Sequence, residues 1–271
     1  MKGAPMIKFI ACDLDGTLLN SKKEFPERLS RVIGELAKQN VIFCVSSGRQ
    51  YYSLCKQLED VRDQIYIIAE NGAMVYDQNG NMLVCEPMDA KTCCDIIKIC
   101  DSDPDLYPVV CGVKSAYGTA KNTPILDKIT PYYLAYETVD DLCAAARNDE
   151  IMKLAIYDAQ GSEPHCYPML KDYYDSHIVA VSGVDWLDVM KKGVTKGKAI
   201  EELCAKLGWD RAECMAFGDF LNDFDMLRAC GESYAMENGH EDLKRIAKHI
   251  APDNDSDGVM RVICEVFGIE Y

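Results

Sequence analysis

Short apolar runs alternate with segments of helical periodicity along the first 85 residues. Runs of this kind predict buried strands, whereas apolar residues that repeat every three or four positions predict helices. We therefore expect strands at residues 6–12, 41–46, 64–69, 73–76 and 82–85, and helices at 26–39 and 50–58. The dipeptide Asn79-Gly80 predicts a tight hairpin turn. Strands alternating with helices are typical of a mainly parallel sheet, so this part predicts half of a doubly wound α/β domain.

The pattern differs over residues 86–185, where helical and strand-like segments mix and proline and glycine are frequent. The helical segments are 90–100, 140–147 and 164–174, and the strand-like segments are 106–111, 152–157 and 178–182. Beyond residue 185 the alternation of strands and helices resumes. The pattern therefore predicts an α/β core formed by residues 1–85 and 186–271, with an α+β domain inserted at 86–185.

Charge and composition narrow the class of protein. The 29 Lys and Arg residues against 44 Asp and Glu give a net charge of −15, and no basic run is present. Nucleic acids and anionic membranes bind clustered cations, so we expect neither as a partner. The chain has no apolar run of about 18 residues and meets acidic residues early, which predicts a cytoplasmic protein. Its 14 cysteines are scattered without a Cys-x-x-Cys pair, so we expect reduced thiols, and no heptad pattern suggests more than a monomer.

Polar residues capable of chemistry gather where predicted strands end. They are Asp13 and Asp15 after the first strand, Ser47 and Gly48 after the second, Lys196 at a helix start, and Asp219, Asn222 and Asp223 after a strand at 214–217. Two close carboxylates need a cation or a shared proton, and Mg²⁺ prefers carboxylate and carbonyl oxygens. Serine hydroxyls and amides at a helix start can bind a phosphoryl group. Each group alone is explained by a helix cap or a solvated loop, but all lie on the rim where open α/β sheets bind ligands.

Four of these segments resemble, in order, the four motifs of the haloacid dehalogenase superfamily. They are DLDGT at 13–17, SSGR at 46–49, TKGKAI at 195–200 and GDFLND at 218–223. Further stretches are similar to the Cof-type sugar-phosphatase branch with a type IIB cap: IIAENGAMVYD at 67–77, AFGDFLNDFDML at 216–227, YAMENGHEDLKRIA at 234–247 and DNDSDGV at 253–259. The chain departs from the usual pattern at Ser47, Glu237 and Gly239, and none of these removes a catalytic group. The resemblance implies a Rossmann-like parallel-sheet core with an inserted α+β cap of the C2 type.

The resemblance also implies an activity, namely Mg²⁺-dependent hydrolysis of a small phosphorylated metabolite, such as a sugar phosphate, through an aspartyl-phosphate. Asp13 would be the nucleophile, Asp15 the general acid and base, and Lys196 the cation that offsets the combined charge of Asp13 and the phosphate. The residues implied to bind the phosphoryl group or substrate are Thr17, Ser47, Gly48, Lys196 and Asn222. Those implied to bind Mg²⁺ are Asp13, Asp15 through its carbonyl, Asp219 and Asp223, the last directly or through water.

Two other functions stay open on the sequence alone. A phosphosugar mutase would use the same aspartate but return an isomer, and a phosphate-ligand sensor would keep the fold without catalysis. The presence of Asp13, Asp15 and Lys196 favours an enzyme over a sensor. The substrate is left open among hexose phosphates, pyridoxal phosphate, flavin mononucleotide and other small phosphates. Inserted-domain residues that could contact it are Tyr107, Lys114, Tyr117, Lys121 and His165.

Overall fold

The computed structural model describes residues 6–271, which form two compact units. One unit contains the chain up to Cys85 together with Thr195–Tyr271, and the other is Glu86–Val194. The second boundary therefore lies after Val194, whereas the sequence pattern placed residues 186–194 in the core. The reason is β11 (Trp186–Lys191), which pairs antiparallel with β9 (Ile151–Asp158) inside the second unit.

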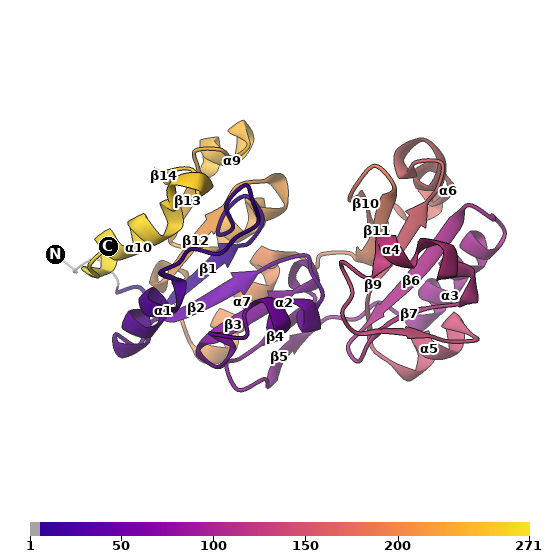
Figure 1. Ribbon diagram of the computed structural model, residues 1–271, viewed down its shortest axis with the longest axis horizontal. Coiled ribbons are helices and arrows are strands. Elements are labelled where there is room, and N and C mark those ends of the chain that lie inside the picture. Colours follow the sequence, from indigo (N-terminus) through magenta and orange to yellow (C-terminus); the bar gives the residue numbers. More distant parts are fainter. Residues whose placement is uncertain (1–5) are drawn as a thin grey trace. The chain divides into compact units, whose positions relative to one another are not determined.

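The first unit is built on an eight-stranded sheet with the order β14-β13-β12-β1-β2-β3-β4-β5 (Figure 1). Six strands are parallel: β1 (Phe9–Asp13), β2 (Ile42–Ser46), β3 (Ile65–Ala69), β12 (Cys214–Gly218), β13 (Glu232–Met236) and β14 (His249–Ala251). The hairpin of β4 (Met74–Tyr76) and β5 (Met82–Cys85) closes one edge antiparallel. Its turn contains Gly80 at φ 80°, as the Asn79-Gly80 pattern predicts.

The helices of this unit are α1 (Leu29–Lys38), α2 (Tyr51–Gln57), α7 (Lys196–Leu207), α8 (Phe224–Ala229), α9 (Glu241–Ile246) and α10 (Gly258–Phe267). In α1 the apolar stripe that predicts the helix is buried. Helix α1 begins three residues after Pro26, and the carbonyl of Pro26 accepts the N–H of Leu29. The buried side chains of α7, α8 and α9 pack on the sheet face formed by Phe9, Ala11 and their neighbours, so β1 lies centrally in this core.

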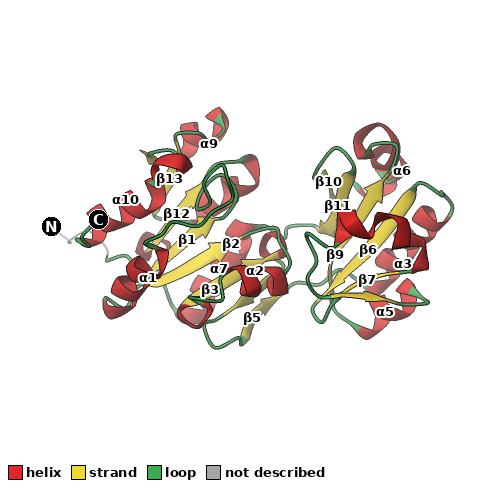
Figure 2. Cartoon of the chain, viewed as in Figure 1, coloured by secondary structure: helices red, strands yellow, loops and turns green. Residues whose placement is uncertain are grey.

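The second unit has a six-stranded sheet with the order β10-β11-β9-β6-β7-β8 (Figure 2). Its other strands are β6 (Leu106–Gly112), β7 (Ala116–Gly118), β8 (Tyr136–Thr138) and β10 (His177–Val181). Helices α3 (Ala90–Asp101) and α5 (Leu142–Asn148) share one apolar core with this sheet, and α4 (Leu126–Ile129) shares another. Residues 162–173 form three short helical turns, among them α6 (Tyr167–Met169), instead of the single helix expected at 164–174, because Pro168 has no N–H to donate within such a helix.

None of the helices within residues 6–271 is long and apolar enough to span a lipid bilayer.

Candidate active site

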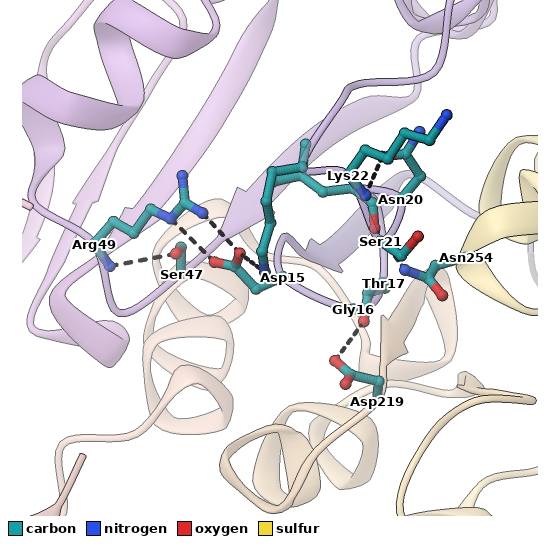
Figure 3. A network of polar contacts seen from close by, with 12 residues as sticks. Asp15, Gly16, Thr17, Asn20, Ser21, Lys22, Ser47, Arg49, Asp219 and Asn254 are labelled. Carbon is teal, nitrogen blue, oxygen red and sulfur yellow. Dashed lines mark hydrogen bonds and ion pairs between the residues drawn. The ribbon is translucent and has the colours of Figure 1, made fainter. Parts of the chain in front are cut away.

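Asp13 ends strand β1, and the chain turns sharply at Gly16, three residues later. The turn requires Gly16, which has φ +83° and lies so close to Asp219 that a Cβ atom would overlap its carboxylate. The hydroxyl of Thr17 donates to Asp219 Oδ1 over 2.9 Å, which joins this turn to the loop after β12 (Figure 3). Two loops that are 202 residues apart in sequence thus form one surface at the carboxyl ends of adjacent strands.

The carboxylates of Asp13, Asp219 and Asp223 can place one oxygen each within 4.8 Å of the others. The ammonium of Lys196, at the start of α7, donates to Asp13 Oδ1 and to Asp223 Oδ1, the latter at 2.7 Å. Lys196 is 1% exposed and Asp223 is 0% exposed, so this is a buried charge cluster. The four residues come from three separate segments, and the sheet topology brings them together.

Three carboxyl groups and one ammonium make up this cluster, so the fully ionised cluster would be negatively charged. Burial and the charge of Asp223 raise the pKa of Asp13 to about 8, although Lys196 acts to lower it. Burial likewise raises the pKa of Asp219. A divalent cation would balance these charges, and Mg²⁺ accepts carboxylate oxygens as ligands. The donor set therefore fits Mg²⁺.

Asp223 also shapes its own loop. Its second oxygen, Oδ2, accepts the backbone N–H groups of Asp219 at 3.0 Å and Phe220 at 3.2 Å. This carboxylate thus bonds to Lys196 and to the chain that carries Asp219. Asn222 lies between them in sequence but is exposed, and the structure does not join it to the buried cluster.

Asp15 has different surroundings. Arg49 donates two hydrogen bonds to its carboxylate, from Nε to Oδ2 at 3.0 Å and from Nη2 to Oδ1 at 2.7 Å, as Figure 3 shows. Lys23 donates to Oδ1 at 2.8 Å. Burial acts to raise the pKa of Asp15, but the hydrogen bonds and charges of these two cations outweigh it and hold the pKa below its usual value.

Ser47 and Gly48 follow β2, beside β1. Ser47 is buried, and its hydroxyl accepts the backbone N–H of Arg49 at 3.3 Å. Gly48 lies against the amide of Asn71, where a Cβ atom would be 2.8 Å from Asn71 Oδ1. Glycine therefore allows the segment after β2 to pack closely against the segment after β3.

Sequence reasoning did not single out four residues that hold these loops. Lys23 and Arg49 bind Asp15, Asn238 donates to the carbonyl of Gly16 at 2.8 Å, and Asn254 donates to that of Leu19 at 2.8 Å. Three of them, Arg49, Asn238 and Asn254, lie within sequence stretches that resemble family motifs, so the motifs could have pointed to them. Lys23 lies in an exposed turn outside these stretches, and nothing in the sequence pattern indicated it.

Four of the inserted-domain residues considered as substrate contacts have partners inside their own unit. Lys114 donates to the carbonyl of Asn148, and the Tyr117 hydroxyl donates to Asp149. Lys121 donates to the carbonyls of Cys100 and Asp103, at and just beyond the end of α3, and His165 bonds the Asp158 carboxylate. These contacts give all four a structural role.

Comparison with known proteins agrees with this architecture. The family model for haloacid dehalogenase-like hydrolases matches residues 10–263. The 5-amino-6-(5-phospho-D-ribitylamino)uracil phosphatase YbjI of Escherichia coli is 30% identical, covering 96% of each chain, and the phosphatase YwpJ of Bacillus subtilis is 27% identical, covering 95% of this chain and 99% of its own. A solved structure from Thermotoga maritima has a TM-score of 0.87 at 26% identity, covering 96% of this chain and 97% of its own. The chain therefore belongs to the haloacid dehalogenase-like hydrolases and is a phosphatase of that family.

Proposed function

We propose that the protein hydrolyses a small phosphorylated metabolite, such as a sugar phosphate, with Mg²⁺ and through a phosphoryl group carried on Asp13. The observation that carries this proposal is the buried cluster in which Lys196 bonds both Asp13 and Asp223. A buried carboxylate beside a fixed ammonium suits attack on an anionic phosphoryl group, because the ammonium offsets the negative charge that gathers there. Asp219 and the carbonyl of Asp15 complete the proposed metal ligands.

Each residue has a defined part in the proposed reaction. Asp13 attacks phosphorus as the bond to the leaving oxygen breaks, and Asp15, which must first take up a proton, gives that proton to the leaving oxygen. Asp15 then takes a proton from water as the water attacks phosphorus and the bond to Asp13 breaks. Ser47 and the Gly48 amide bind phosphoryl oxygens, and Thr17 holds Asp219 in place. Asn222, which is exposed, is left as a contact for the rest of the substrate.

The proposed metal would be bound by Asp13, Asp219 and Asp223, together with the Asp15 carbonyl. When bound, Mg²⁺ supplies positive charge that stabilises the phosphoryl oxygens during transfer. The convergence of three carboxyl groups supports this part of the proposal.

We also propose a cytoplasmic monomer that binds neither nucleic acid nor membrane, and the net charge of −15 supports the exclusion of polyanionic partners.

Release of inorganic phosphate tests the activity directly. The panel contains hexose phosphates, pyridoxal phosphate, flavin mononucleotide, an aryl phosphate and 5-amino-6-(5-phospho-D-ribitylamino)uracil, which the name of the Escherichia coli relative suggests. We expect phosphate release with Mg²⁺, loss of release in chelator, and recovery when Mg²⁺ is restored. Turnover that persists in chelator would contradict the metal assignment, and conversion to an isomer without phosphate release would identify a mutase.

A further inference from the structure

Two cysteine thiols meet in the apolar core of the first unit. Cys204 lies in α7 and Cys214 begins β12, and both pack among the buried residues of this core. Their Sγ atoms are 3.4 Å apart, within hydrogen-bonding distance for sulfur. The sulfurs of a disulfide are about 2.0 Å apart, so an approach of little more than about 1 Å would bring these two atoms to bonding distance.

A short folded connection holds the two thiols together. They are 10 positions apart in sequence. The backbone N–H of Trp209 donates to the carbonyl of Cys204 at 3.0 Å, and the Cys214 Sγ atom lies 3.7 Å from the carbonyl of Asp210. The Glu213 carboxylate accepts the backbone N–H of Asp210 at 3.0 Å and so closes the turn before β12. Backbone and side-chain contacts of the turn therefore keep the thiols adjacent.

The two thiols are not equivalent. Cys214 is 0% exposed, whereas Cys204 is 8% exposed and precedes Ala205 and Lys206, which are exposed. The hydrogen bond between the thiols lowers the pKa of Cys204, although burial acts to raise it. The same hydrogen bond, together with burial, raises the pKa of Cys214. Peroxides react with the thiolate form, so Cys204 is the thiol that such an oxidant attacks first.

We propose that Cys204 and Cys214 form a reversible oxidation site, at which hydrogen peroxide converts the two thiols into a disulfide that ties α7 to β12. A sulfenic acid that forms beside a second thiol condenses with it to a disulfide. All 14 cysteines of the chain are free thiols in the structure, which is the reduced state of this site. The oxidation needs neither substrate nor metal and is therefore independent of the proposed function.

The oxidation takes two electrons from the pair of sulfurs and gives them to one peroxide molecule. The Cys204 thiolate attacks a peroxide oxygen, the O–O bond breaks, and the leaving hydroxide takes up the proton that Cys204 gave up, which forms the first water. The Cys214 sulfur then attacks the Cys204 sulfur, the S–O bond of the sulfenic acid breaks, and the leaving hydroxide takes the Cys214 thiol proton, which forms the second water. Oxidation of Cys204 also removes the thiolate that raises the pKa of Cys214.

Peptide mapping of the folded wild-type protein tests the proposal. The protein is treated with hydrogen peroxide, the remaining thiols are blocked with iodoacetamide, and the chain is digested with trypsin. Trypsin cleaves after Lys206 and Arg211, so Cys204 and Cys214 fall in separate peptides. We expect a disulfide to join these two peptides in most molecules, and dithiothreitol to restore both thiols.

Two variants make the assignment specific. Cys204→Ala removes one of the two thiols and should abolish the joined peptides. Cys230→Ala is the matched control and should leave them unchanged, since Cys230 is another buried cysteine of the same core. The wild-type peptide map decides the question even where a variant does not fold.

Three results would overturn the proposal. One is sulfinic or sulfonic acid on Cys204 without the joined peptides, which would show that Cys214 does not reach the oxidised sulfur. Another is a disulfide that joins Cys204 or Cys214 to Cys230. The third is free thiols at both positions in a sample in which Cys55, a less buried cysteine, is oxidised.

Discussion

Charge burial governs the site at the scale of single residues. Asp13, Asp223 and Lys196 are each less than a tenth exposed, and the proposed reaction uses all three in their charged forms. A buried charge is tolerated only when partners compensate for it, and removal of one partner leaves the others without compensation. The same side chains therefore determine both stability and chemistry.

Lys196→Met should destabilise the protein as well as inactivate it. The change leaves Asp13 and Asp223 facing one another without the ammonium, so we expect the free energy of unfolding to fall by about 3–5 kcal/mol. Denaturant unfolding without Mg²⁺ measures this. Lys198→Met in the same helix is the control, because Lys198 is about half exposed and should change stability little. Equal stability of the two variants would show that the buried ion pairs are not as described.

The sequence predicted the buried cluster better than its surroundings. Asp13, Lys196, Asp219 and Asp223 could be placed together because strand ends in a parallel sheet share one rim, and the structure joins them. The bond between Lys23 and Asp15 could not be predicted, because Lys23 reaches Asp15 from an irregular turn whose path depends on Asp255, far away in sequence. Periodicity carries no information about contacts of that kind.

At the scale of elements, close packing around α7 fixes the position of Lys196. Thr195 caps the helix by accepting the N–H of Lys198 at 3.1 Å, and its backbone leaves no room for a Cβ atom at Gly72. Gly197 lies against the backbone of Asp225 at the start of α8. The position of Lys196 therefore depends on two glycines where larger residues would push the segments apart.

Gly197→Ala should displace the start of α7. The added methyl would overlap the Asp225 backbone, so we expect a loss of about 1–3 kcal/mol in the free energy of unfolding and at least about tenfold lower turnover. Gly34→Ala in α1 is the matched control, since no atom lies within 4 Å of its added Cβ and the helix gains stability. Phosphate-release kinetics and thermal unfolding of both variants check this. An active, fully stable Gly197→Ala protein would refute the packing argument.

Strand β11 shows why the sequence pattern did not place residues 186–194 in the second unit. Leu187 and Val189 alternate as expected for a strand, but Asp188 between them is also buried, beside Lys153 at 3.6 Å. This alternation fits a strand but does not identify the sheet to which the strand belongs, so residues 186–194 were assigned to the core. The partner strand β9, which also supplies the ion pair of Asp188, lies apart from β11 in sequence.

His165 should make the stability of the second unit depend on pH. Its Nδ1 atom lies 3.0 Å from both Asp158 oxygens and its Nε2 atom 3.3 Å from Asp103, and the hydrogen bond to Asp158 raises the pKa of His165. Because the folded pKa lies above the unfolded value of about 6.5, the stabilisation is fully present below about pH 6.5 and is lost as pH rises through the folded pKa. Thermal unfolding of wild type and His165→Gln should therefore differ most near about pH 6 and converge near about pH 9. A difference that grows with pH would contradict the assigned pairing.

At the scale of the whole molecule, charge balance should couple metal binding to folding. The net charge of −15 includes the acidic cluster, which forms only when β1, β12 and α7 come together. A cation that binds only the folded state stabilises it by mass action. Folding and metal binding should therefore support one another.

Mg²⁺ should raise the melting temperature of the protein without any substrate. At about 100 times its Kd, a ligand adds about 2.7 kcal/mol to the free energy of unfolding, which corresponds to about 5–10 °C for a chain of this size. Asp219→Asn removes one proposed ligand and should reduce the shift, whereas Asp225→Asn, an exposed neighbour, should keep it. Identical shifts in all three proteins would place the metal elsewhere.

In the proposed reaction, Asp13 carries the phosphoryl group during turnover. Acid quenching of the enzyme while it turns over a phosphate ester, followed by peptide mass spectrometry, measures this directly. We expect phosphate on Asp13 in the wild-type protein, and neither phosphate on that peptide nor turnover in a folded Asp13→Asn variant. Phosphate trapped on another residue, or full turnover by Asp13→Asn, would contradict it.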